Sequence, residues 1–247
     1  MDASIMGKVT SIAEGVEKLL TMRYREVPEY TLEPRKDGEF LDTLVWNGNR
    51  VPLFSTHFDQ QIRAMAKYGQ DPEQNSALNV YSYMGSDVTL DELLFRELDI
   101  AEFILHSKIK KVTAFVNKNA VNLIAVMENE TTANLELGNT MEPGTHNQCQ
   151  HRLITKHGAA CDRSPADMIA QHQVYLYGKN GRQVFDDDEA YLYGLNEEDV
   201  AKTLTLHAIF TEQEQQWADW AENEARYRKV IAAVYESDRL GKTICLA

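Results

Sequence analysis

The chain has 247 residues, of which 43% are hydrophobic and 26% charged, and its formal net charge is −13 at pH 7. This apolar content is enough for one substantial core or two small ones. Because so acidic a surface repels phosphate backbones and anionic lipids, the charge argues against nucleic-acid and membrane partners. Apolar runs such as Leu123–Met127 fall far short of a membrane span, and the N-terminus carries no secretory signal. Three cysteines without a C-x-x-C pair fit a reducing compartment, so we expect a soluble, cytoplasmic protein.

Residues 1–85 predict a small element made of a helix and a hairpin. Residues 5–22 carry apolar side chains at the spacing of one helix face. Short strand-like runs follow between residues 30 and 54, and the turn pair Asn47-Gly48, which tolerates positive φ, joins the last two as a hairpin. A short helix is expected over residues 58–68. The polar segment after it contains a proline, so we place the main boundary between this segment and Gly85.

Residues 86–247 begin with a helix and a series of strands. A strand over residues 77–84 leads into this part, and Ser86 or Asp87 would supply the N-terminal cap of a helix over residues 90–106. Strand-like runs are then expected at residues 111–116, 121–127, 132–137, 151–156 and 173–177.

The C-terminal part of the chain predicts two helices and a final short strand. One helix is expected over residues 197–210 and a longer one over residues 212–240, which Gly241 stops. Consecutive strands with helices before and after them indicate an α+β domain, with a mostly antiparallel open sheet backed by helices.

Three segments of residues 88–247 resemble the C-terminal domain of the Gfo/Idh/MocA oxidoreductases, a family that acts mainly on sugars and polyols. Residues 98–105 (LDIAEFIL) are similar to the helix after the family's catalytic histidine. Residues 132–139 (TANLELGN) and 153–158 (LITKHG) resemble a pair of its sheet strands and the glycine turn after them. Residues 227–246 (YRKVIAAVYESDRLGKTICL) resemble its closing helix and strand. The resemblance implies a sugar-like small-molecule ligand and a homodimer that buries the open sheet face between its subunits.

The sequence departs from that family in the part that binds the nucleotide. Members of the family begin with a Rossmann unit, whose glycine-rich turn lets backbone amides approach a pyrophosphate. No G-x-G-x-x-G occurs in the 247 residues, and the family's Glu-Lys-Pro segment is also absent. We therefore expect no cofactor site in this chain, and NAD(P) only through a separate, Rossmann-bearing partner chain.

A second departure concerns the catalytic pair. The family places an Asp and, four residues later, a His that faces the substrate carbinol, a pairing suited to proton transfer coupled to hydride transfer. When Leu98-Asp99 is aligned with the family's I-D, Glu92 and Arg96 occupy those two positions. A carboxylate accepts a proton, whereas arginine stays protonated at any working pH. The alternative is that Glu92 and Arg96 form an i,i+4 ion pair on an exposed helix face.

A candidate substrate site lies in the loop region around residue 160. Lys156 and His157, together with Asp162 and Arg163, carry the donors and acceptors that a sugar pocket needs for hydroxyl groups. The alternative is turn chemistry, in which Gly158 supplies an unusual φ angle.

Histidines and cysteines gather in the same stretch of sequence. Cys149 and His151 share one face of an extended strand because they are two residues apart. These ligand types suit zinc, but their spacing, H-x2-C-x-H-x5-H-x3-C, matches no structural zinc pattern. We therefore predict no metal site, with Cys149 and His151 as the weak alternative.

Three functions are consistent with these residues. The first is a substrate-binding and oligomerisation subunit that works with a separate nucleotide-binding oxidoreductase chain on a sugar- or polyol-like compound. The second is a non-catalytic binding or assembly protein, which Arg96 in place of a histidine favours. The third is a nucleotide-free, metal-assisted lyase or isomerase at the His/Cys cluster. We do not expect the chain to act as an oxidoreductase alone.

Overall fold

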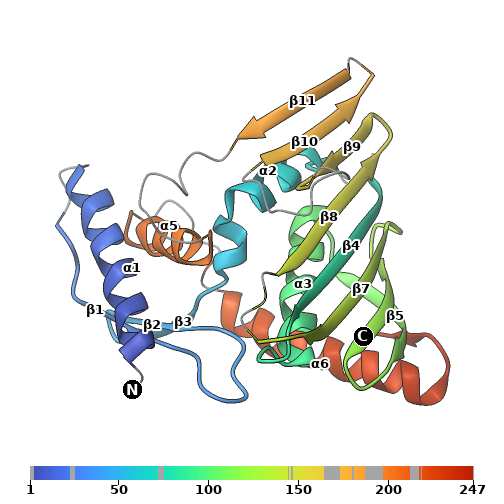
Figure 1. Ribbon diagram of the computed structural model, residues 1–247, viewed down its shortest axis with the longest axis horizontal. Coiled ribbons are helices and arrows are strands. Elements are labelled where there is room, and N and C mark those ends of the chain that lie inside the picture. Colours follow the sequence, from blue (N-terminus) through green and yellow to red (C-terminus); the bar gives the residue numbers. More distant parts are fainter. Residues whose placement is uncertain are drawn as a thin grey trace. The chain divides into compact units, whose positions relative to one another are not determined.

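The computed structural model describes residues 3–22, 26–71, 75–143, 145, 147–163, 173–179, 181–186, 197–211, 217 and 219–246. The chain divides into two compact units: Met1–Gln60 with Asp188–Ala225, and Gln61–Asp187 with Arg226–Ala247 (Figure 1). This grouping differs from a single division near residue 85. Residues 75–85 form a strand of the larger unit's sheet, and a helix over residues 197–211 packs within the smaller unit.

The smaller unit combines helices with a small antiparallel sheet. Its elements are α1 (Ala3–Met22), β1 (Tyr30–Glu33), β2 (Thr43–Trp46), β3 (Asn49–Pro52), the 3-10 helix η1 (Ser55–Phe58) and α5 (Glu197–Thr211). Between β2 and β3, Asn47 and Gly48 adopt φ angles of 49° and 76°, as a two-residue hairpin turn requires. The predicted helix-plus-hairpin element is confirmed, and α5 is an additional helix of this unit.

Aromatic side chains of the smaller unit contact one another beside its mainly aliphatic core. The ring of Phe210 on α5 lies 5.0 Å from that of Tyr30 and 5.4 Å from that of Trp46, measured between centroids. Trp220 is buried, and its ring lies 5.6 Å from that of Phe54. Each such tilted or edge-on pair adds about 0.5–1.5 kcal/mol beyond the area that it buries. Trp220 is therefore a core residue of the smaller unit.

The larger unit is built on a mixed, nine-stranded sheet. Its elements are α2 (Gln60–Tyr68), β4 (Asn75–Gly85), α3 (Leu90–Leu105), β5 (Ile109–Val116), β6 (Ala120–Met127), β7 (Thr132–Met141), β8 (Gln148–Thr155), β9 (Gly158–Cys161), β10 (Gln173–Gly178), β11 (Gly181–Asp186), α6 (Trp220–Leu240, whose residues up to Ala225 belong to the smaller unit) and β12 (Ile244–Cys245). The strand order is β11-β10-β9-β8-β4-β7-β6-β5-β12. Only the β4–β7 pairing is parallel; the other pairings in this sheet are antiparallel. The α+β class is confirmed, and the sheet is mixed and mostly antiparallel.

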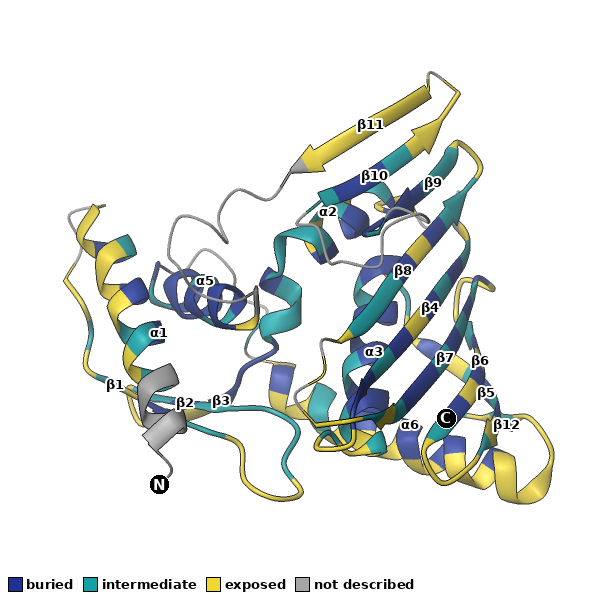
Figure 2. Ribbon diagram, viewed as in Figure 1, coloured by how far each residue is buried: buried dark blue, intermediate teal, exposed yellow. Residues whose placement is uncertain are grey.

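The two faces of this sheet differ in burial. Along β4, Leu78, Val80 and Ser82 are buried on the face that packs against α3, whereas Asn79 and Tyr81 point to the open face. Figure 2 colours the strands of this sheet by burial. This alternation follows from the two-residue period of a strand. On α3, 11 of the 16 residues are buried, all between Leu93 and Leu105, so the helix is enclosed on most of its sides and packs against β4 and β7.

The closing helix, α6, is held to β5 by hydrogen bonds from its last turns. Ser237 Oγ accepts a hydrogen bond from the backbone N–H of Ala114 (3.1 Å) and donates one to the carbonyl of Lys242 (2.7 Å). The helix ends at Leu240, and Gly241 adopts a φ of 60°. The serine and glycine of the closing segment are thus structural residues. Residues 212–216 and 218, where we expected the helix to begin, lie outside the described residues.

The N-terminal cap of α3 is a correction to the sequence analysis. The cap is Thr89, not Ser86 or Asp87: Thr89 Oγ1 accepts a hydrogen bond from the backbone N–H of Glu92, and the Glu92 carboxylate accepts one from the backbone N–H of Thr89. This reciprocal pair is a capping box. None of the helices in the described ranges is long and apolar enough to cross a membrane.

Candidate functional site

A fully buried histidine of β8, His151, lies between two carboxylates. His151 Nε2 is 2.8 Å from Glu97 Oε2 on α3, and His151 Nδ1 is 2.5 Å from Asp162 Oδ2, just after β9. The other oxygen of Asp162 accepts a hydrogen bond from the backbone N–H of His151 at 2.7 Å. Glu97 is 0% exposed, His151 2% and Asp162 7%. Residues from three separate segments therefore meet in one water-excluded cluster.

The geometry fixes the charge of this histidine. An ionised carboxylate can only accept hydrogen bonds, so both ring nitrogens must donate and the ring is an imidazolium. Burial opposes its charged form, but the charges of Asp162 and Glu97 outweigh burial and raise the pKa of His151 well above its usual value. Burial would likewise raise the pKa of Glu97, but the charges of His151 and Arg96 hold that pKa at about 2.

Arg96 forms the outer side of the same cluster. Its Nη1 lies 3.7 Å from Glu97 Oε1 and 3.7 Å from Cys149 Sγ, and its side chain is 37% exposed. Cys149 is also 3.0 Å from the hydroxyl of Ser82, its partner across β4 and β8. With two cations and two carboxylates, the group of Arg96, Glu97, His151 and Asp162 is formally neutral.

Glu92, the other residue predicted at the catalytic pair, has a structural role. Its Oε2 accepts hydrogen bonds from the backbone N–H of Thr89 at 2.7 Å and from the Thr89 hydroxyl at 2.8 Å. The carboxylate thus closes the first turn of α3, while Arg96 reaches toward Glu97 and Cys149 one turn later.

The start of α3 is a strand-to-helix turn, but it does not suit a dinucleotide. A pyrophosphate binds where free backbone amides and the positive end of a helix meet. Here the capping box occupies the first turn, and the carboxylates of Asp91 and Glu92 place negative charge at that helix end. This turn therefore does not fit NAD(P), and no reaction step is derived through that cofactor at this turn.

The four predicted substrate residues do not form one pocket. Lys156 and His157 are exposed at the tight turn between β8 and β9, whereas Asp162 is buried beyond the opposite end of β9. Gly158 has a φ of 145°, and a side chain there would meet the carbonyl of Tyr177 at 1.8 Å. The turn therefore agrees with the alternative stated above, in which Gly158 supplies an unusual φ angle.

Arg163 lies beyond Asp162 and binds neighbouring protein groups. Its guanidinium donates to Gln148 Oε1 and to the carbonyl of Asn147, both at 3.1 Å. Of the predicted substrate residues, only Asp162 therefore enters the charged cluster, through its bonds to His151.

Cys149 and His151 do face the same side of β8, as their spacing predicted. However, both ring nitrogens of His151 are hydrogen-bonded to carboxylates, and a metal ligand needs a free lone pair on one of them. Within the described ranges, no three His, Cys, Asp or Glu side chains are arranged to hold a metal ion. The geometry gives His151 the role of a buried cation.

Glu97, the residue that links α3 to the cluster, was not among the predicted site residues. A usable signal was present. Glu97 falls between Leu93, Leu94, Leu98 and Ala101, at the spacing of the apolar face. Because an ionised side chain is almost never fully buried without a partner, a glutamate on an apolar helix face indicates a buried ion pair.

No family model matches the sequence, and no curated protein matches it. Solved structures are similar in fold. An oxidoreductase from Agrobacterium radiobacter in complex with NAD+, L-tartaric acid and magnesium matches 77% of this chain and 63% of its own, with a TM-score of 0.56 and 16% identity. For the aldose-aldose oxidoreductase of Caulobacter crescentus complexed with glycerol, the coverage is 79% and 63%, the TM-score 0.59 and the identity 12%. An oxidoreductase from Sinorhizobium meliloti matches 78% of this chain and 64% of its own, with a TM-score of 0.61 and 8% identity.

The chain spans less than two thirds of the length of each of these proteins. At identities of 8–16%, the likeness is one of fold. Over more than three quarters of its length, the chain has the fold of Gfo/Idh/MocA-type oxidoreductases, the family that its sequence resembles.

Proposed function

We propose that this chain binds a sugar- or polyol-like compound at the Arg96 cluster and depends on a separate nucleotide-binding chain for any oxidoreductase reaction. The observation that carries this proposal is the state of Arg96. It occupies the position where the family resemblance implies a proton-transferring histidine, and it is a permanent cation beside Glu97. A group that cannot release a proton can bind and orient a ligand oxygen but cannot act as an acid or base.

The charge balance of the cluster favours an uncharged ligand. Arg96 and His151 are offset by Glu97 and Asp162, so a neutral hydroxyl group can accept a hydrogen bond from the guanidinium without adding an uncompensated charge. Of two similar structures, one contains glycerol, an uncharged polyol, and the other L-tartaric acid, a diacid that carries negative charge at neutral pH. The glycerol agrees with the ligand class that the resemblance implies.

Binding and turnover test the proposal separately. Purified protein should bind glycerol or myo-inositol weakly in calorimetric titrations, and Arg96→Ala should weaken that binding. The matched control is Arg152→Ala, which removes an exposed arginine of β8 outside the cluster. This variant should bind the polyol as the natural protein does. Removing a hydrogen bond from a charged donor should weaken binding by about tenfold or more.

The partner part of the proposal has its own readout. NADH should show no saturable fluorescence change with the isolated chain, and NAD(H)-linked polyol turnover should appear only after a Rossmann-bearing chain is added. Tight, stoichiometric binding of NAD(P)H by the isolated chain, or turnover by it alone, would contradict the proposal. The homodimer through the open sheet face stays a prediction, which light scattering at micromolar concentration tests.

A non-catalytic assembly protein is the second candidate, because Arg96 removes the expected proton-transfer group whatever the ligand. Failure to bind any polyol, together with a stable complex with a partner chain, would favour it over the first proposal. A metal-assisted lyase or isomerase has less support, because the ring nitrogens of His151 are already hydrogen-bonded to Glu97 and Asp162. Metal analysis of the purified protein and His151→Ala test that third possibility.

A further inference from the structure

The two edges of the nine-stranded sheet differ in how the rest of the chain covers them. At one edge, the short strand β12 pairs with part of β5. Next to it, Ser237 Oγ of α6 accepts a hydrogen bond from the backbone N–H of Ala114 at 3.1 Å. Asp238 Oδ1 accepts one from the backbone N–H of Val116 at 2.9 Å. Side chains of α6 thus satisfy β5 amides that β12 does not reach, and this edge is closed.

The opposite edge of the sheet, β11, is open. This six-residue strand pairs with β10 on one side (Figure 1). Within the described ranges, no segment pairs with its other side. Residues 181–185 are all exposed (Figure 2). Because alternate residues of an edge strand turn their N–H and C=O groups outward, β11 presents a row of backbone donors and acceptors on which another strand can pair.

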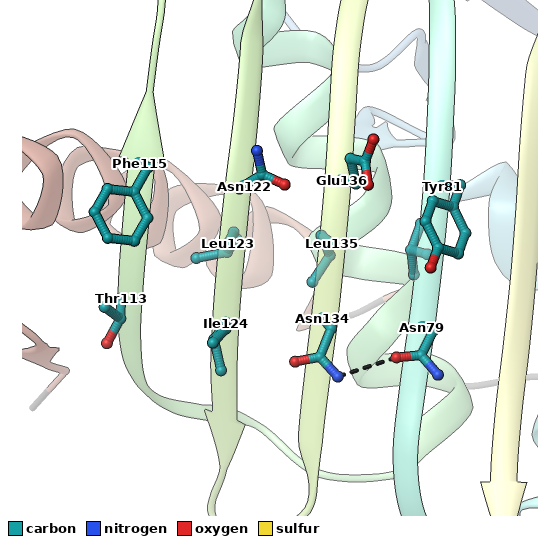
Figure 3. A pocket seen from close by; sticks show the side chains of 11 residues that line it. Asn79, Tyr81, Thr113, Phe115, Asn122, Leu123, Ile124, Asn134, Leu135 and Glu136 are labelled. Carbon is teal, nitrogen blue, oxygen red and sulfur yellow. Dashed lines mark hydrogen bonds between the residues drawn. The ribbon is translucent and has the colours of Figure 1, made fainter.

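β11 also exposes an apolar side chain on each face of the sheet. Val184 and Phe185 are each 38% exposed. Successive cross-strand pairs place Val184 in line with Asn79 of β4, which lies on the open face (Figure 3). Phe185 therefore points to the opposite, helix-covered side. Unpaired backbone and apolar side chains on one edge favour the addition of a strand.

The sequence of β11 (GRQVFD) is complementary to itself when two copies run antiparallel. When Val184 of one copy lies opposite Val184 of the second, Gln183 lies opposite Phe185. In the same register Arg182 lies opposite Asp186, and the symmetry forms this pairing of opposite charges twice. Apolar pairs and pairs of opposite charge are the cross-strand combinations that stabilise an antiparallel ladder.

We propose that β11 pairs antiparallel with β11 of a second copy of this chain, around a two-fold axis perpendicular to the sheet. A two-fold contact of this kind uses the same surface on both copies, as the self-complementary sequence requires. Because Val184 lies opposite itself, even-numbered side chains of β11 point to the same face in both copies. The two sheets therefore join edge to edge with their open faces on the same side, and the contact leaves those faces available for the predicted burial between subunits.

The test measures the mass of the full chain by light scattering and the dissociation constant of its assembly by analytical ultracentrifugation. Val184→Lys places two like charges opposite each other at the two-fold axis, so it should raise the dissociation constant of the β11 contact about tenfold or more. Val27→Lys is the matched control, because Val27 is 42% exposed and lies outside the strands. Ile124→Lys, on the open face and 50% exposed, should leave the β11 contact intact (Figure 3).

The charge pairs provide a second test of the register. Arg182→Asp and Asp186→Arg should each raise the dissociation constant about fivefold, because each substitution brings like charges together at both ends of the ladder. The double variant exchanges the two charges and should restore the dissociation constant to within about twofold of that of the natural protein. Such recovery would not follow if the single substitutions acted by damaging the β10–β11 hairpin.

The outcomes separate this contact from the predicted open-face dimer. A smaller mass for Val184→Lys than for Val27→Lys, with recovery in the double charge variant, supports pairing through β11. A monomeric natural protein at micromolar concentration overturns the proposal. So does an assembly that Ile124→Lys dissociates and Val184→Lys leaves intact, since the copies would then meet through the open face alone.

Discussion

Replacing His151 with glutamine should destabilise the protein strongly, because it removes the cation between Glu97 and Asp162. Both carboxylates would stay buried, and neither could replace the charge of the imidazolium. Removing one partner of a buried ion pair costs about 3–5 kcal/mol. For a chain of this size, each kcal/mol lowers the midpoint of thermal unfolding by about 2–4 °C, so the expected decrease is roughly 6–20 °C.

The pH dependence of this loss follows from the shifted pKa values. Burial favours the neutral ring, but Asp162 and Glu97 raise the folded-state pKa of His151 above 6.5. The stabilisation from His151 is therefore complete below its unfolded-state pKa and is lost as pH rises through the folded-state value. The pKa of Glu97 falls from 4.5 to about 2, so its contribution is present above pH 4.5 and is lost as the pH falls toward 2.

The assay is thermal unfolding followed by circular dichroism across this pH range, with His151→Gln compared to the natural protein. The difference between the two should be greatest at about pH 5–6.5 and should shrink at higher pH. His157→Gln, at the exposed β8–β9 turn, is the matched control and should change the midpoint little. Adding Glu97→Gln to His151→Gln should recover part of the loss, because one buried charge disappears. Equal melting of the His151 and His157 variants at every pH would contradict the role of His151 as a buried cation.

Three further substitutions test single features of the fold by thermal or urea unfolding. Gly158→Ala should cost about 2 kcal/mol or more, because φ is 145° and a side chain meets the β10 backbone; Gly181→Ala, with φ of 96° in open space, should cost only about 1 kcal/mol. Thr89→Ala should cost about 1 kcal/mol through loss of the α3 cap, while Ser86→Ala should be neutral; the opposite order would restore Ser86 as the cap. Ser237→Ala should cost about 1–3 kcal/mol because it leaves a buried β5 amide unpaired, and an unchanged midpoint would contradict that role.

Local patterns in the sequence predicted the parts of the fold that local interactions decide. The Asn47-Gly48 pair predicted the β2–β3 hairpin because only a few residues adopt two successive positive φ angles without strain. Apolar periodicity located α3 within a residue or so of its ends, although its cap was misplaced. The signal for Thr89 was the glutamate three residues later, which completes a capping box.

Features that depend on distant pairing were beyond the sequence analysis. The parallel pairing of β4 with β7 joins residues such as Asn79 and Asn134, which are 55 positions apart. The His151–Glu97 contact joins positions 54 apart. No local preference specifies either, because both result from which strands become neighbours. The same limit explains why Lys156 and His157 were grouped with Asp162: they are close in sequence but lie at opposite ends of a strand.

The place of β4 in the sheet has a consequence for how the larger unit assembles. Two groups of antiparallel strands flank β4. One group consists of β7, β6, β5 and β12, and the other of β8, β9, β10 and β11. Most neighbours within each group are close in sequence and can pair early, whereas β4 must join partners more than fifty residues away, which is slow because the chain between them must be ordered first. β4 is thus the single strand that connects two ladders. Val80→Pro, in the middle of β4, should make the backbone amides of the two ladders differ in their protection from hydrogen exchange. The strands within each ladder should stay paired.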